Sequence, residues 1–176
     1  MFHAYFAASL PAIALDSRPP FSEDEFAASC RQHLSSSDFA AFEALRSGGK
    51  TKHPFVVAWR ALETQLRGVS AKIRAAKLGV SGEQWRHPHE SVPFSLESAV
   101  TAAFAESNPL KRDLALKKIL WNGAEEIAGL DTFSSSALFS YFVRLRIIIA
   151  RANADAGFET GKNRLLSLST KPSSQK

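Results

Sequence analysis

The longest regular pattern of apolar residues in the chain lies between residues 54 and 78. Apolar side chains recur there at alternating spacings of four and three residues, which is the heptad pattern of a helix that packs along one face. We call this row the heptad seam, and its members are Phe55, Trp59, Leu62, Leu66, Val69, Ile73 and Ala76. Pro54 suits a first helical turn and Gly79 a helix end, so the pattern predicts one long helix of about 25 residues.

A second apolar segment follows the serines at 134–136 and contains the run Ile147-Ile148-Ile149. That run alone favours a β-strand, because β-branched residues are enriched in strands. The segment is nevertheless longer than a typical strand, and apolar residues repeat in it at helical spacing. The repeating positions are Leu138, Phe142, Leu145 and Ile149. We therefore expect a central, largely buried helix over residues 134–156 that ends at Gly157.

Two shorter helices are predicted from their capping residues. Ser22 and Glu25 have the spacing of a capping box, which starts a helix that runs to about His33. The serines at 35–37 start a second helix, and Gly48-Gly49 ends it. The apolar residues of that second helix are Phe39, Phe42 and Leu45.

Two further helices are expected in the middle of the chain. Residues 80–94 are interrupted by glycine and proline, which predicts a connection or a helix corner. Ser95 is expected to cap a helix that runs to about Glu106. Asn108-Pro109 pairs an N-cap residue with an N1 proline, and it opens a helix whose apolar residues extend to Leu130.

The predicted fold class is all-α, a helical bundle with one long heptad-patterned helix and a central buried C-terminal helix. Residues 1–20 leave two alternatives open, a short helix or an extended segment. We expect a single domain over residues 1–168, made of an N-terminal helical hairpin (1–49) and a helical body (54–168). A polar, disordered tail is expected over residues 169–176.

The net charge of +5 is unevenly distributed along the chain. Residues 1–46 carry three basic and six acidic side chains, whereas the remainder carries nineteen basic and eleven acidic ones. An acidic head on a basic body suits oriented docking on a partner, and a plain solvated surface explains it equally well. No apolar stretch approaches the ~20 residues that span a bilayer, and Cys30 is the single cysteine, so we expect a soluble, cytoplasmic protein.

The motifs that could carry chemistry are incomplete. Residues 86–90 (RHPHE) offer two imidazoles and a carboxylate, but a metal site needs further ligands, so a solvated loop is the simpler interpretation. Residues 47–51 (SGGKT) imitate the end of a phosphate-binding P-loop, yet Ala44 stands where the motif needs its first glycine. We therefore expect neither a metal nor a cofactor.

Catalytic side chains are not indicated either. Cys30 lies beside Arg31, which could lower the pKa of its thiol, although a small core residue is the simpler interpretation. Glu125 and Glu126 are adjacent, so on a helix they point to different faces and cannot act as a general acid and base pair. The sequence thus predicts a protein that is not an enzyme.

A basic stripe lies on another face of the long helix, because Arg60, Arg67 and Arg74 are each seven residues apart. This stripe and a sequence pI of about 9.6 raise the possibility of nucleic-acid binding. Such binding would require a denser patch with exposed stacking aromatics, whereas Trp59 falls on the heptad seam and is expected to be buried. We rank nucleic acid below protein as a partner.

Several motifs in order along the chain resemble those of one small bacterial family. They are residues 5–11 (YFAASLP), 19–22 (PPFS), 25–26 (EF), 74–79 (RAAKLG), 108–110 (NPL) and 141–145 (YFVRL), together with Leu62-Glu63, Leu66-Arg67, Lys72, Trp121, Phe133 and Arg151. The family is encoded beside subunits of V-type (vacuolar/archaeal-like) rotary ATPases. It looks like a shortened relative of the ATPase C subunit, the all-helical adaptor that caps the membrane rotor ring and seats the central stalk.

The resemblance implies a non-enzymatic adaptor or accessory subunit at the cytoplasmic face of the inner membrane, with the central stalk and the membrane ring as partners. The chain is about half the length expected of a C subunit, so an assembly role stays open. The alternatives are a stand-alone helical interaction scaffold and a basic nucleic-acid-binding helical protein. The interface residues expected from the resemblance are Arg60, Arg67, Arg74, Arg144 and Arg151.

Overall fold

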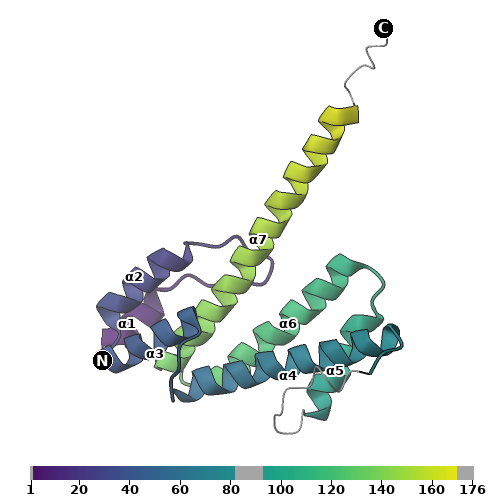
Figure 1. Ribbon diagram of the computed structural model, residues 1–176. Coiled ribbons are helices and arrows are strands. Elements are labelled where there is room, and N and C mark those ends of the chain that lie inside the picture. The colour runs from purple at the N-terminus through teal and green to yellow at the C-terminus, as the bar shows by residue number, and fades with distance from the viewer. Residues whose placement is uncertain (1, 82–92, 170–176) are drawn as a thin grey trace.

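The computed structural model describes residues 2–81 and 93–169, and in this part of the chain all regular structure is helical. The expectation of an all-α fold is therefore confirmed. Figure 1 shows how the helices are arranged. They are α1 (Phe2–Ser9), α2 (Glu23–His33), α3 (Ser36–Ser47), α4 (Pro54–Lys77), α5 (Phe94–Ala105), α6 (Pro109–Ala128) and α7 (Ser135–Ser169).

The N-terminal segment, which the sequence left open, begins as the short helix α1. Its Phe6 is buried and its ring stacks on that of His33 at the end of α2, with ring centroids 4.9 Å apart. The chain after α1 is fastened to α7, because the hydroxyl of Tyr141 donates a hydrogen bond of 2.9 Å to the carbonyl oxygen of Pro11. Tertiary packing therefore decides between the two alternatives in favour of helix.

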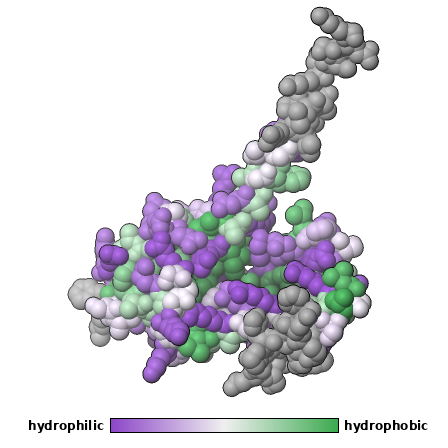
Figure 2. All heavy atoms as spheres, viewed as in Figure 1, coloured by the Kyte–Doolittle hydropathy of each residue, from purple (hydrophilic) through white to green (hydrophobic). Residues whose placement is uncertain are grey.

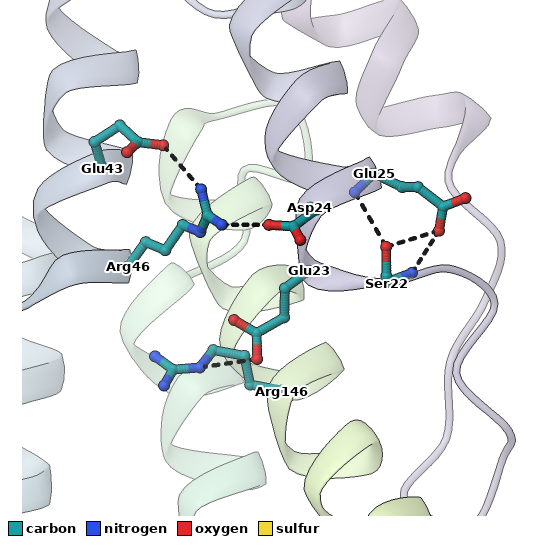
Figure 3. A network of polar contacts seen from close by, with 7 residues as sticks. All are labelled: Ser22, Glu23, Asp24, Glu25, Glu43, Arg46 and Arg146. Carbon is teal, nitrogen blue, oxygen red and sulfur yellow. Dashed lines mark hydrogen bonds and ion pairs between the residues drawn. The ribbon is translucent and has the colours of Figure 1, made fainter.

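The capping predictions for α2 and α3 are confirmed. Ser22 accepts a hydrogen bond from the backbone of Glu25, whose carboxylate in turn accepts from the backbone of Ser22 (Figure 3). Ser35 caps α3, because its hydroxyl oxygen accepts a hydrogen bond of 3.1 Å from the backbone N–H of Asp38. Gly48 ends α3 with φ +81°, a left-handed conformation that glycine adopts without steric cost.

Helix α4 begins at Pro54 as predicted, and the described chain leaves it through Gly79 at φ +69°. The first part of the heptad seam is buried, with Trp59 only 5% exposed. At the last turn the prediction is wrong, since Ala75 is buried and Ala76 is exposed. The chain turns back at this helix end, where the backbone N–H of Val80 donates a hydrogen bond of 3.1 Å to the carbonyl oxygen of Ala75.

The N-cap residue predicted for α5, Ser95, is wrong. The helix begins at Phe94, and Pro93 takes the N-cap position without a side-chain hydrogen bond. The carbonyl oxygen of Pro93 accepts from the backbone of Leu96 and Glu97, which leaves Ser95 inside the first turn. The connection before Pro93 lies outside the described residues, apart from its first two positions.

Helix α6 opens as predicted, because the side chain of Asn108 accepts from the backbone of Leu110 and Pro109 occupies the first position. It ends at Gly129, whose φ of +73° turns the chain away. Leu130 was expected within this helix, but it lies beyond the end and is fully exposed.

Two clusters of buried side chains hold the described helices together. The larger core surrounds the first half of α7 and takes in α1, α2, α3, the start of α4 and the end of α6. The smaller core joins the second half of α4 to α5 and α6. Leu62 packs against both cores, and it lies so close to Gly123 that a Cβ added there would stand 2.4 Å from its Cδ2 atom. The absent side chain at Gly123 therefore lets α4 and α6 approach each other.

Helix α7 begins where the serines predict, since the Ser134 hydroxyl accepts from the backbone of Ala137. Its first half is central and buried, as expected, with Phe139 and Phe142 fully covered. The predicted end at Gly157 is wrong, because the helix continues to Ser169. A glycine inside a helix costs about 1 kcal/mol relative to alanine, which weakens a helix without ending it. The disordered tail was predicted to begin at residue 169, but Ser169 belongs to α7. Residues 170–176 lie outside the described residues.

Candidate interaction surface

The second half of α7 leaves the body of the molecule. Every residue from Asn153 to Asn163 is exposed, and Figure 1 shows this stretch projecting beyond the other helices. Phe158 is the large apolar side chain of that stretch, with 65% of its surface exposed. We call residues 153–169 the α7 arm. Its described ion pairs stay within α7, between Arg151 and Asp155 and between Lys162 and Glu159, and Figure 2 shows the described part of the arm rising from the body.

A groove of about 340 Å³ lies at the base of the α7 arm, between α7, α6 and α4. We call it the arm groove. Its apolar lining comes from Trp59, Leu120, Val143, Ile147, Ile149 and Ala150. Its charged lining comes from Glu23, Glu63, Lys117 and Arg146, so both signs of charge surround the apolar side chains.

The wall of the arm groove on the side of α2 is fixed by ion pairs. Arg146 on α7 lies 3.6 Å from the carboxylate of Glu23 at the start of α2 (Figure 3). Arg46 on α3 pairs with both Asp24 and Glu43, which ties α3 to the same end of α2. Exposed ion pairs of this kind contribute little stability each, but the pair of Arg146 and Glu23 sets the position of two charged side chains that line the groove.

Arg60, the first member of the predicted basic stripe, is used inside the fold. Its Nη2 atom donates to the carbonyl oxygens of Ala44 and Gly49, at 2.7 and 2.6 Å. These carbonyls belong to the end of α3 and the connection to α4, so one guanidinium closes that turn. The heptad spacing of the arginines could not reveal these two carbonyls, because they approach α4 only in the tertiary structure.

Arg67 and Arg74 lie farther along α4 and differ from Arg60. Arg67 has a side chain that is 75% exposed, and it approaches Glu63 one turn away at 3.9 Å. Arg74 stands over the ring of Phe104 on α5. The stripe therefore does not act as one surface, since its members meet three different surroundings.

Arg144 and Arg151 on α7 also point to different elements. Arg144 pairs with Glu125 and lies over the ring of Trp121, both on α6. Burial lowers the pKa of Arg144, while the neighbouring charge of Glu125 acts in the opposite direction. Arg151 donates a hydrogen bond of 2.9 Å to the carbonyl oxygen of Leu15, which holds the α1–α2 connection. A partner-binding role for the five arginines stays a prediction, and Arg67 and Arg74 are the two that are exposed.

Cys30 is a core residue. Its side chain is completely buried in the larger core, and burial raises the pKa of its thiol to about 12, with the charge of Glu43 adding to the effect. The alternative of a lowered pKa beside Arg31 is therefore wrong, because loss of hydration outweighs a neighbouring surface cation.

The candidate metal ligands at residues 86–90 lie outside the described residues. Within residues 2–81 and 93–169, no group of three or more His, Cys, Asp or Glu side chains is placed to hold a metal ion. Across the same ranges, none of the helices combines the length and the apolar character that crossing a membrane requires.

Comparison of the chain with models of protein families, with curated proteins and with solved structures finds no match.

The geometry adds two features that the sequence pattern did not predict. One is the α7 arm, hidden by the glycines at 157 and 161, and the other is a group of cations around Phe104 to which Lys77 and Arg112 belong.

Proposed function

We propose that the protein is a non-catalytic helical adaptor that binds another protein through the α7 arm. The observation that carries this proposal is the run of exposed residues from Asn153 to Asn163 inside a continuous helix. A helix of this length has little stability of its own in water, and most helices in proteins are stabilised by packing of one face. A helix of a partner protein lying along the arm supplies that packing.

The arm groove extends the same surface into the body. Its apolar side chains, such as Ile147 and Ile149, lie on α7 just before the arm begins. An amphipathic partner helix on the arm would place apolar residues against them and its charged flanks beside Lys117 and Glu63. Charges of both signs around the groove would select the orientation of the partner more than they would add affinity.

The resemblance to the family encoded beside V-type ATPase subunits supports a particular partner. The protein acts, on this proposal, as an accessory subunit of a bacterial V/A-type rotary ATPase that links the central stalk to the membrane rotor ring or aids its assembly. A projecting helical arm and an acidic hairpin on a basic body suit such a link, because a coupling element has to dock on its partners in one orientation. The stand-alone scaffold remains the alternative and would use the same arm on other proteins.

The experiment is affinity purification of the tagged full chain from cells that contain the rotary ATPase. Central-stalk and ring subunits are expected to co-purify with the wild type. Phe158→Arg on the arm should reduce their recovery at least tenfold, whereas Leu130→Arg, a control at a fully exposed apolar residue outside the arm, should not.

A folded wild-type protein that recovers neither kind of subunit would contradict the ATPase assignment. Recovery of other proteins in a Phe158-dependent way would favour the scaffold alternative. Equal recovery by both variants would show that the arm is not the binding surface.

A further inference from the structure

Three cationic side chains surround one aromatic ring at the far end of the smaller core. Arg74 and Lys77 come from the last turn of α4, and Arg112 comes from the first turn of α6. Their charged groups lie 5.6, 5.8 and 5.8 Å from the centre of the Phe104 ring. The ring itself is buried, only 5% exposed, so the three cations rather than the ring meet solvent. We call these three side chains the cation cluster.

The cation cluster lines a hollow of about 300 Å³, together with Leu78 and Phe104. Lys77 uses one of its donors on the carbonyl oxygen of Phe104, at 3.1 Å, which fixes α4 against the end of α5. Neither guanidinium has a hydrogen bond or an ion pair with any described residue. Arg74 and Arg112 thus offer their donors to the hollow or to water.

The carboxylates of the neighbouring elements are already engaged. Glu97 pairs with Lys72 and Asp113 with Lys117, at 2.8 and 2.7 Å. Glu106 accepts a hydrogen bond of 3.1 Å from the backbone of Asn108. No ion pair joins any of these three described acids to the cation cluster.

Three like charges in this arrangement repel one another. No two of them lie farther apart than the sum of their distances to the ring centre, about 12 Å, which is comparable with the Debye length at moderate ionic strength. A cation over a ring gains about 0.5–1 kcal/mol at an exposed site, and one small ring cannot favour three at once. An anion in the hollow would remove the repulsion and satisfy the guanidinium donors.

We propose that the cation cluster binds a phosphate group, carried either by a small soluble ester or by a phospholipid headgroup. The planar forks of Arg74 and Arg112 match pairs of phosphate oxygens, and Lys77 adds a point charge. Charges that converge on one hollow suit a compact, doubly charged group better than an extended acidic segment of a protein. Nucleic acid is less well suited, because the buried Phe104 offers no face on which a base could stack.

The test is isothermal titration calorimetry with glycerol 3-phosphate and with pyrophosphate, in chloride buffer of constant ionic strength. Saturable binding at one site is expected for the wild type. The double variant Arg74→Gln/Arg112→Gln should weaken it at least tenfold. The matched control Lys111→Gln/Lys118→Gln removes the same charge from exposed side chains of α6 and should change it less than twofold.

Thermal melting checks that each variant is folded, and Arg74→Gln alone serves if the double variant is not, because Arg74 is exposed. Co-sedimentation with phosphatidylcholine vesicles, with and without phosphatidic acid, distinguishes the two sources. If the wild type sediments with the phosphatidic acid vesicles and the double variant does not, the source is a lipid headgroup. If the wild type binds glycerol 3-phosphate or pyrophosphate in the calorimeter but does not sediment with these vesicles, the source is a small soluble phosphate. Either result supports the site.

Three results would overturn the proposal. One is the absence of saturable binding to both phosphate compounds and to the vesicles. Another is equal weakening by the two double variants, which would mean general electrostatic attraction. The third is cluster-dependent binding of a mixed-sequence oligonucleotide or an acidic peptide at concentrations where neither the phosphate compounds nor the vesicles bind.

Discussion

Three buried polar atoms in the described part of the chain lack a hydrogen-bond partner, namely His53 Nδ1, Ser70 Oγ and Ser140 Oγ. An unsatisfied buried group costs about 1–3 kcal/mol, so each such atom is a place where the fold gives up stability. His53 is the most informative of the three, because it is titratable. Its Nε2 atom meets the hydroxyl of Ser135 at 3.2 Å, and its ring centre lies 4.6 Å from that of Phe139.

At the residue scale, His53 predicts a pH dependence of stability. Burial lowers the pKa of His53 below its ordinary 6.5, and the charge of Asp38 opposes this only in part. Below that value the unfolded chain binds a proton that the folded chain resists, so the free energy of unfolding falls as the pH drops. We expect full stability above pH 6.5 and a decline below it of at most about 1.4 kcal/mol per pH unit from this group.

Urea unfolding at a series of pH values measures this effect in the wild type and in His53→Gln, which should show a shallower decline. Ser135→Ala is the matched control, because it removes the hydroxyl partner but leaves the buried imidazole, and so should keep most of the wild-type slope. Identical slopes for wild type and His53→Gln would contradict the assignment.

At the scale of elements, α7 combines two different helices in one. Its first half is covered on nearly all sides by the larger core, while every residue of its second half from Asn153 to Asn163 is exposed. Gly157 and Gly161 fall in the second half, and a Cβ at either position would meet open space. The body therefore gives no packing reason for these glycines.

The glycines predict a stability effect that is confined to the α7 arm. Gly157→Ala with Gly161→Ala should strengthen the arm by about 1 kcal/mol per substitution, since alanine is the better helix former. Amide hydrogen exchange should slow in the arm, and the melting temperature of the body should stay the same. A raised melting temperature of the whole molecule would show that the arm is part of the cooperative fold.

At the scale of the whole molecule, helix α4 contributes side chains to both the larger and the smaller core. Leu62, at the middle of the heptad seam, contacts both of them and sits against Gly123. This side chain is thus placed to couple the unfolding of the acidic hairpin side with that of the α4–α5–α6 side.

Leu62→Ala should cost about 2 kcal/mol, at the lower end for a leucine because the side chain is only partly buried. Chemical unfolding followed by tryptophan fluorescence should become broader as the two cores lose their common contact. Leu114→Ala on α6, at a side chain that is 41% exposed, is the control and should have little effect. A sharp transition with unchanged midpoint in Leu62→Ala would contradict this coupling.

The sequence by itself determined the all-α class, the caps at Ser22, Ser35 and Asn108, and the burial of Trp59, because these follow from interactions between residues close in the chain. The tertiary structure decided the environments. Arg60 closes a turn and the thiol of Cys30 is buried deep in the larger core, since the carbonyls and apolar groups around them come from distant segments. The tertiary structure also decided that α7 continues past Gly157 and that three cations surround the ring of Phe104. Local spacing could not predict either feature, because both depend on how separate helices pack.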